Sequence, residues 1–363
     1  MKLTETILLL FVLGVAGVAW INSGGEKNKT HLLQFVVPEG WPQPVYDFKQ
    51  NPVTQEGFAL GRKLFYDGRL SKDGNFPCAS CHQQYAAFAT YDHNLSHGFN
   101  NSFTKRNAPP LFNLAWQKEF MWDGGINHLD LQPLAPMSDT NEMGGEGLDS
   151  ILAKLKADAT YRKMFKAAFG DDHITTQRLT RALSQFIVMM VSANSKYDRV
   201  MRKEDSFDLP QRLGYEIFKR KCAGCHTEPL FTDLSYRNAG LTADDYLKDE
   251  GRMMITHDKN DSLKFKIPSL RNAQVTFPYG HDGRFYSLLE VMNHYRKDVV
   301  NGPTTDSLLK HGITLSNFEI GQLTAFIYTL TDSSFLSNPR FAPPGYENRT
   351  QQRPTEHQHI YKQ

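Results

Sequence analysis

Apolar positions along this chain recur mainly at the three-to-four-residue spacing of amphipathic helices. The pattern covers residues 150–169, 175–191 and 316–330, and Thr175 and Ser316 are suitable N-cap residues for the last two segments. Few segments show the alternation of apolar and polar residues that is typical of strands. The pattern therefore predicts a mainly α-helical protein.

One apolar pattern occurs twice, once in each half of the chain. Residues 60–65 read Leu-Gly-x-x-Leu-Phe and residues 213–218 read Leu-Gly-x-x-Ile-Phe, and both have helical spacing. Each precedes a Cys-x-x-Cys-His segment, at 78–82 and at 222–226. The repetition predicts an internal duplication, with a helix leading into each cysteine motif.

The two cysteine motifs indicate covalently bound haem. They read Cys78-Ala79-Ser80-Cys81-His82 and Cys222-Ala223-Gly224-Cys225-His226, and they use all four cysteines of the chain. In this pattern both thiols bond to the porphyrin and the adjacent histidine becomes an axial iron ligand. A zinc half-site or a thioredoxin-like pair would not need a histidine directly after the second cysteine in both copies. The sequence therefore predicts two haem c groups, a redox function and no disulfide.

Shorter matches between the halves support the duplication. Arg106-Asn107-Ala108 is matched by Arg271-Asn272-Ala273, and Trp122-Asp123-Gly124 is matched by His281-Asp282-Gly283. We therefore expect two mainly α-helical, cytochrome c-like domains.

Length and composition fit an exported two-domain protein. The 363 residues suit two domains, which we place at 32–200 and 205–340. The apolar run over 7–21 is short for a membrane span of about 20 residues. Residues 1–21 are thus expected to be a signal peptide, with an uncleaved anchor as the alternative. Export to the periplasm or another extracytoplasmic space agrees with haem c attachment, which takes place outside the cytoplasm. Residues 343–363 are expected to form a flexible tail.

Charge gives no reason to expect a nucleic-acid partner. The chain has 41 Lys and Arg residues against 39 Asp and Glu residues, a net charge of +2.

The repeat predicts that the two haems are unequal. Pro136 follows Trp122 by 14 residues, and Tyr295 follows His281 by the same 14 residues (136 − 122 and 295 − 281). A tyrosine can ligate iron through its phenolate, whereas a proline cannot. One haem is therefore expected to be closed by a side chain and the other to be open to a small molecule. Met292, one helical turn before Tyr295, is the alternative ligand.

Residues 54–330 resemble the bacterial di-haem cytochrome c peroxidase and MauG family. The markers, in order, are both haem motifs, Arg106-Asn107-Ala108-Pro109, Phe120-Met121-Trp122-Asp123-Gly124, Gln132, Glu142-Met143-Gly144 and residues 276–283. The resemblance implies two α-helical cytochrome c domains with a calcium ion between them. The family's calcium ligands fall on Asn107, Thr276 and Pro278, the last two through backbone carbonyls.

The resemblance also implies roles for side chains around the first haem. The family reduces peroxide there, and its catalytic carboxylate falls on Glu142 and its neighbouring amide on Gln132. Trp122 falls on the aromatic bridge between the haems. The alternatives are a surface carboxylate for Glu142 and a core tryptophan for Trp122.

Four further residues are candidate haem contacts. Arg106 and Arg271 are candidates to pair with haem propionates, with an ordinary surface salt bridge as the alternative. His97 resembles the histidine that occupies the sixth site of the first haem in many resting peroxidases, with an exposed loop histidine as the alternative. Tyr295 is where ordinary peroxidases have Met and MauG-like members have Tyr, and a Tyr ligand would lower the haem potential.

The leading functional hypothesis is a cytochrome c peroxidase. It would reduce hydrogen peroxide with electrons from a small cytochrome c or cupredoxin. The alternatives are a MauG-like enzyme that oxidises a protein side chain and a non-enzymatic di-haem electron carrier. The family often forms dimers, so a homodimer is compatible with each hypothesis.

Overall fold

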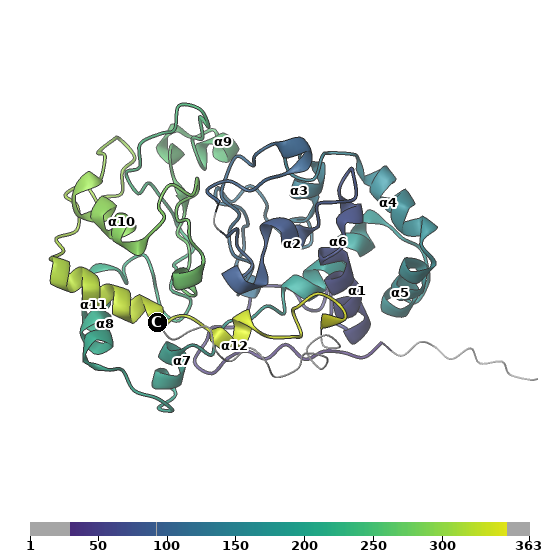
Figure 1. Ribbon diagram of the computed structural model, residues 1–363, viewed down its shortest axis with the longest axis horizontal. Coiled ribbons are helices and arrows are strands. Elements are labelled where there is room, and N and C mark those ends of the chain that lie inside the picture. The colour runs from purple at the N-terminus through teal and green to yellow at the C-terminus, as the bar shows by residue number, and fades with distance from the viewer. Residues whose placement is uncertain (1–29, 92, 347–363) are drawn as a thin grey trace, which may run out of the picture.

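The computed structural model describes residues 30–91 and 93–346, which form two mainly helical lobes side by side (Figure 1). The first lobe holds α1 (Gln55–Phe65), α2 (Cys78–Cys81), α3 (Leu134–Ser138), α4 (Leu148–Ala157), α5 (Ala159–Phe169) and α6 (Thr176–Ile187). The second holds α7 (Lys196–Met201), α8 (Leu209–Lys221), α9 (Met253–Thr256), α10 (Leu288–Asn293), the π-helical turn η7 (His294–Asp298) and α11 (Asn317–Tyr328).

Short elements complete the structure. The two strands β1 (Tyr236–Arg237) and β2 (Phe265–Lys266) pair antiparallel, and α12 (Ser333–Leu336) lies near the end of the described chain. The 3-10 turns are η1 (Gly68–Leu70), η2 (Gln84–Ala86), η3 (Phe99–Asn101), η4 (Leu114–Trp116), η5 (Lys259–Asp261) and η6 (Ala273–Val275). The prediction of a mainly α-helical protein is confirmed.

The predicted helices begin where their capping residues stand. The side chain of Thr175 accepts a hydrogen bond from the backbone of Arg178, and Ser316 forms a capping box with Glu319. The single helical segment expected over 150–169 is instead two helices, α4 and α5. Asp158 has extended backbone angles between them and caps α5, which ends the first helix.

Each lobe is built on one helix pair that crosses at a glycine. An added Cβ at Gly61 of α1 would lie 1.9 Å from the backbone oxygen of Ala182 in α6, and one at Gly214 of α8 would lie 1.9 Å from that of Gln322 in α11. Both positions therefore require glycine, because any side chain would push the helices apart. This shared contact supports the duplication, which stays a prediction.

The geometry corrects one of the matches between the halves. Asn272 and Asn113 each have a φ of 57° and each begins a 3-10 turn, η6 and η4. Asn113, rather than Asn107, is therefore the structural counterpart of Asn272. The short Arg-Asn-Ala likeness had aligned the wrong asparagine, so Arg106 and Arg271 do not occupy equivalent places.

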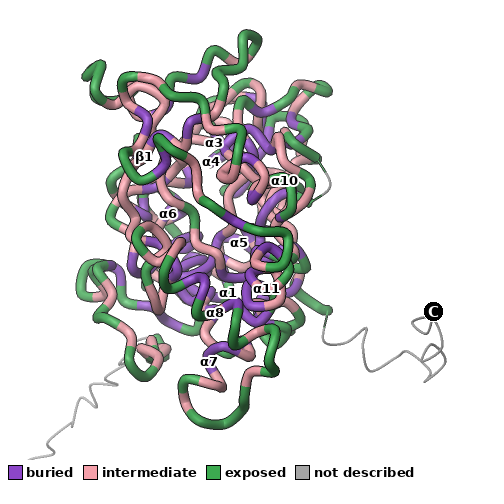
Figure 2. Tube along the Cα trace, turned by 90° about the vertical axis from the view of Figure 1, so that its left-hand side faces the viewer, coloured by how far each residue is buried: buried purple, intermediate pink, exposed green. Residues whose placement is uncertain are grey.

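The chain crosses between the lobes at both domain boundaries. Phe335, which the sequence placed in the second domain, packs in the core of the first lobe, and so does Phe341, just beyond the predicted end of that domain. Tyr197, placed in the first domain, packs in the core of the second lobe. Figure 2 shows buried segments running through the body of the molecule. The end of the described chain thus joins the two lobes.

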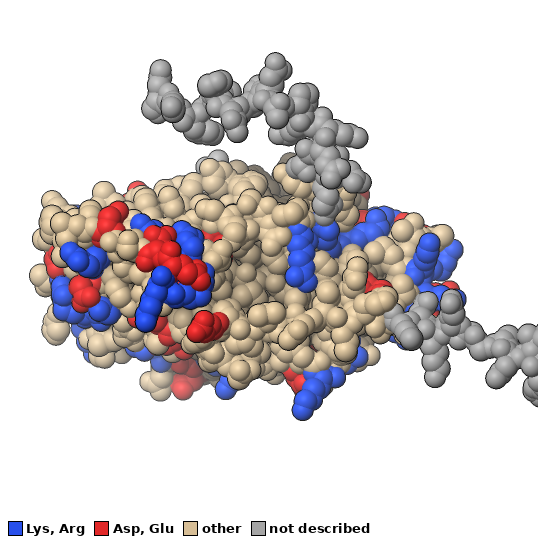
Figure 3. Space-filling view, turned by 90° about the horizontal axis from the view of Figure 1, so that it is seen from below, with Lys and Arg blue, Asp and Glu red and all other residues tan. Residues whose placement is uncertain are grey.

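The predicted signal peptide or anchor, and residues 347–363 of the predicted tail, lie outside the described residues. Within the described part, no helix has the length and apolar character needed to cross a membrane. Figure 3 shows basic and acidic side chains beside one another on the left of the view, whereas the middle of that face carries few charges.

Candidate haem sites and the domain interface

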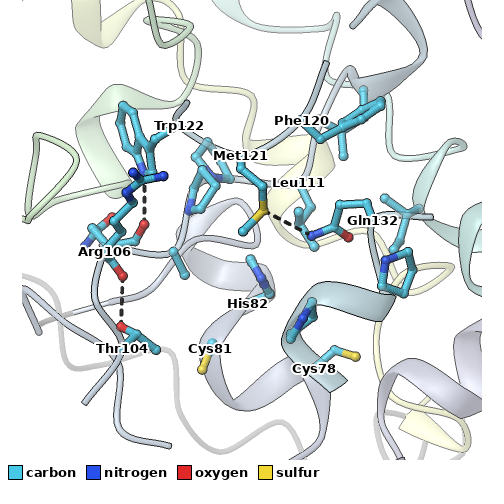
Figure 4. Close-up of a pocket in the computed structure, with 18 of the residues that line it drawn as sticks. Cys78, Cys81, His82, Thr104, Arg106, Leu111, Phe120, Met121, Trp122 and Gln132 are labelled. Carbon is cyan, nitrogen blue, oxygen red and sulfur yellow. Dashed lines mark hydrogen bonds between the residues drawn. The ribbon is translucent and has the colours of Figure 1, made fainter. Parts of the chain in front are cut away.

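The first cysteine motif forms one wall of an apolar cavity (Figure 4). Cys78, Cys81 and His82 lie on and just after α2 and line this cavity together with Phe65, Leu111, Phe112, Phe120, Met143, Leu183 and Ile187. Neither cysteine forms a disulfide. An apolar cavity with two thiols and a histidine at its wall fits the covalent attachment of a haem.

His82 has the orientation and the protonation state that an iron ligand needs. Its Nδ1 lies 2.7 Å from the backbone oxygen of Phe88, which fixes the ring and leaves Nε2 for a metal. Burial lowers the pKa of His82 to about 4, so the ring is in the neutral form that binds metals.

The second motif repeats this arrangement in the other lobe. The Nδ1 atom of His226 lies 3.2 Å from the backbone oxygens of Phe231 and Pro268, and burial lowers the pKa of His226. Neither Cys222 nor Cys225 forms a disulfide. Phe231 and Phe88 both have positive φ values, 56° and 61°, so the chain turns in the same way to present the carbonyl to each histidine.

Tyr295 lies beside the second motif. It stands in η7, and such π-helical turns are frequent at functional sites. Burial, then the neighbouring thiols of Cys225 and Cys222, raise the pKa of Tyr295 to about 12. Met292 packs in the second core, where it is 7% exposed. Tyr295 is thus placed to meet a haem held by this motif, and its ligation remains a proposal.

Glu142 lies in the first cavity with its carboxylate unbonded. It lines the cavity, and among the described residues no side chain or backbone amide donates a hydrogen bond to its carboxylate. Burial, then the negative charge of Asp139, raise the pKa of Glu142 to about 7. Its charge also helps to raise the pKa of the Cys81 thiol, so the carboxyl lies near the haem motif. Gln132 lines the same cavity, with Nε2 3.8 Å from the sulfur of Met121.

Trp122 joins the two lobes at the wall of this cavity. Its Nε1 donates to the backbone oxygen of Asn107 at 2.9 Å, and its own backbone oxygen accepts a hydrogen bond of 2.7 Å from Lys266 of β2. The indole therefore lies between the first haem cavity and the second lobe.

The three proposed calcium ligands offer free oxygen atoms at this interface. The backbone amide of Asn107 donates to His281 at 2.8 Å, which brings it to the loop that carries Thr276 and Pro278. The Oδ1 atom of Asn107 and the carbonyl oxygens of Thr276 and Pro278 accept no hydrogen bond from the described residues. Amide and carbonyl oxygens are the donors that calcium prefers, so this set fits a calcium ion, which stays a proposal.

The two arginines are paired with carboxylates, contrary to expectation. Arg271 is fully buried, and its two terminal nitrogens lie 2.8 and 2.7 Å from the carboxylate of Asp198. It does not line the first cavity. Arg106 does line the cavity, but its guanidinium binds Asp123 and Asp249. Both arginines already have anionic partners in the protein, which is the physical reason that neither is a free partner for a propionate.

Lys266 is the cation at the cavity wall that the sequence did not reveal. Its Nζ donates to the backbone oxygen of Glu119 and to Oε1 of Gln117 at 3.3 Å. Neither of these partners is a carboxylate, although the charges of Glu119 and Asp123 act on it. Burial lowers its pKa to about 8. Lys266 is therefore better suited to meet a propionate than either arginine, and no sequence motif marks it.

His97 lies outside the first cavity. Its ring is exposed and packs against His93 and Phe103, with centroid distances of 5.1 and 4.6 Å. Only its backbone approaches the motif, since its carbonyl oxygen is 4.0 Å from the sulfur of Cys81. In this conformation the ring is not placed as a sixth ligand, because it points to a neighbouring loop rather than into the cavity.

Comparison with known proteins agrees with this arrangement. A family model described as di-haem cytochrome c peroxidase matches residues 55–206. The methylamine utilization protein MauG of Methylophilus methylotrophus is 32% identical over 337 residues, which cover 91% of this chain and 96% of that protein. The chain belongs to the di-haem cytochrome c peroxidase and MauG family. Membership supports haem c as the cofactor of both motifs.

Relatives in this family have different names. The cytochrome c peroxidase Ccp of Escherichia coli (strain K12) is 31% identical over 274 residues, 73% of this chain and 58% of that protein. The crystal structure of a MauG-like protein associated with microbial copper homeostasis matches with a TM-score of 0.76 and 32% identity, over 86% of this chain and 99% of that one. The chain is thus similar, over most of its length, both to proteins named MauG and to proteins named cytochrome c peroxidase.

Proposed function

We propose that the protein reduces hydrogen peroxide to water at the first haem, with electrons that arrive through the second. The observation that carries this proposal is Glu142, an unbonded carboxyl in the cavity of the first motif with a pKa of about 7. A group with this pKa can both accept and return a proton near neutral pH.

Each residue of the cavity would have its own role in this reaction. Cys78, Cys81 and His82 would hold a haem, which would supply the binding site for peroxide and the electrons that reduce it. The carboxylate of Glu142 takes a proton from the near oxygen of peroxide and returns it to the far oxygen, which leaves as water. One peroxide, two electrons and two protons give two waters. The amide of Gln132 can hydrogen-bond the bound peroxide, and the apolar wall limits the access of water.

Electrons would reach this cavity across the interface at Trp122. The indole lines the cavity and its backbone is bonded to the second lobe, so it shortens the gap between the two redox centres. We propose a small cytochrome c or cupredoxin as the donor to the second haem, and a periplasmic location. A calcium ion at Asn107, Thr276 and Pro278 would hold the loops of both lobes together. A homodimer is compatible with this scheme.

A MauG-like reaction is the second candidate, and Tyr295 favours it. Tyrosine at this position resembles MauG-like members, and His97 does not fill the first cavity as it would in a gated peroxidase. Peroxide would again be reduced with the help of Glu142, but the electrons would come from a side chain of a protein partner. A simple electron carrier would have no use for a free carboxyl in an open cavity.

Peroxide-dependent oxidation of a reduced small cytochrome c tests the proposal. With the haem-loaded protein we expect two cytochromes to be oxidised for each peroxide consumed. Peroxide consumption without cytochrome oxidation would favour the MauG-like reaction. If the protein neither consumes peroxide nor oxidises the cytochrome, both proposed reactions are contradicted.

A further inference from the structure

Two tyrosines of the second lobe share one carboxylate oxygen. The hydroxyl of Tyr215 donates to Oε1 of Glu228 at 2.8 Å, and the hydroxyl of Tyr197 donates to the same atom. Tyr197 is 4% exposed, whereas Tyr215 on α8 is partly exposed. The two ring centroids are 6.1 Å apart. Burial, then Glu228, raise the pKa of both phenols, so both remain protonated.

This cluster is linked through Phe231 to His226, the proposed ligand of the second haem. The ring of Tyr197 packs edge-on against Phe231, with 4.8 Å between the centroids. The backbone oxygen of Phe231 lies 3.2 Å from Nδ1 of His226. An unbroken series of contacts thus runs from His226 through Phe231 and Tyr197 to Tyr215 at the surface.

We infer that Tyr197, Tyr215 and Glu228 form a redox-active tyrosine site that gives an electron to the second haem site after peroxide has oxidised the haem-loaded protein beyond the ferric level. The inference rests on the proposed function, because peroxide supplies the oxidising equivalent. One phenol loses one electron to the oxidised haem domain, and its O–H proton moves to Oε1 of Glu228. The products are a neutral tyrosyl radical and a protonated carboxyl, so charge and atoms balance.

The hydrogen bond to Glu228 is what makes this chemistry accessible. A phenol that loses an electron becomes a strong acid, and a carboxylate already in hydrogen-bond contact accepts the proton without any rearrangement. Because Tyr215 is partly exposed, the site lets an oxidising equivalent leave the haem domain and react with a reductant at the surface.

In the first lobe Tyr161 donates to Asp67 at 2.6 Å and Tyr46 donates to Asp130 at 2.7 Å, but no ring contact joins either tyrosine to Phe88, the counterpart of Phe231. Phe88 presents its carbonyl to His82, but its ring contacts are Phe65 and Phe335 rather than a tyrosine. Tyr66 packs on Phe65 and donates to the backbone oxygen of Phe341 at 2.6 Å. A peptide carbonyl is too weak a base to hold a proton. Tyr66 is therefore a matched control: a partly buried phenol near a haem motif without a carboxylate as proton acceptor.

Freeze-quench electron paramagnetic resonance after peroxide addition, without donor, tests the inference on the haem-loaded full chain. We expect a tyrosyl signal in the wild type and in Tyr66→Phe, and its loss in the double variant Tyr197→Phe/Tyr215→Phe. Glu228→Gln keeps both phenols but removes the base, so the signal should also be lost. All variants should still show a peroxide-dependent change in the haem spectrum.

Two results would overturn the inference alone. In the first, the haem spectrum of the wild type responds to peroxide but no tyrosyl signal appears. In the second, the tyrosyl signal persists in the double variant or in Glu228→Gln. A haem spectrum that does not respond to peroxide would contradict the proposed function, and the inference would fall with it.

Discussion

Replacing Glu142 with glutamine is the sharpest perturbation of the first cavity. Glutamine keeps the size of the side chain and can still donate a hydrogen bond, but it cannot accept and return a proton. Positioned acid–base groups contribute typically about 10² to 10⁴-fold to a rate. We therefore expect the Glu142→Gln protein to bind both haems normally and to react with peroxide at least about 100-fold more slowly, which corresponds to about 2.7 kcal/mol.

The pH dependence of the reaction rate with peroxide tests the same prediction in a second way. With a pKa of about 7, roughly one tenth of Glu142 is ionised at pH 6 and about nine tenths at pH 8. Since the ionised form accepts the first proton, the bimolecular rate should rise about tenfold over this range and level off above it. Stopped-flow absorbance of the haem-loaded protein measures this rate, and Glu142→Gln should abolish the rise.

Asp139→Asn is the matched control. The charge of Asp139 is the second cause of the raised pKa of Glu142, after burial. Its removal should move the rise to lower pH and leave the rate at high pH unchanged. An unchanged rate and pH profile in Glu142→Gln would refute the assignment of the carboxyl as the proton carrier.

Three other changes test the remaining assignments. Tyr295→Phe should alter the absorption spectrum and midpoint potential of the second haem only, whereas Met292→Leu should alter neither; the reverse pattern would make Met292 the ligand. Asn107→Ala removes one of three oxygen donors and should weaken calcium binding in isothermal titration calorimetry, and unchanged affinity would exclude this site. Arg271→Met leaves Asp198 as an unpaired buried charge and should lower the free energy of unfolding by about 3–5 kcal/mol in denaturant titrations. A loss below about 1 kcal/mol would show that the pair does not stabilise the fold.

Local patterns in the sequence were sufficient where the chemistry depends on neighbouring residues. The haem motifs need only five consecutive residues, and the equal spacing from Trp122 to Pro136 and from His281 to Tyr295 pointed to a difference between the haems. The structure places Tyr295 beside the second motif and Pro136 in the first cavity. The caps at Thr175 and Ser316 are local in the same way.

Long-range partners could not be predicted in this way. Arg106 meets Asp249, 143 residues away, and Arg271 meets Asp198, 73 residues away. A short motif carries no information about which distant carboxylate will face it once the lobes pack. Lys266 reaches the first cavity from the second lobe for the same reason, and only the assembled interface reveals it.

The most direct test of the account is an electron count in a single turnover. The haem-loaded protein is fully reduced, freed of excess reductant and mixed with one equivalent of hydrogen peroxide, and the oxidation state of both haems is followed by absorbance. The account predicts that one peroxide removes two electrons and leaves both haems ferric. Haems that remain reduced after mixing would contradict it.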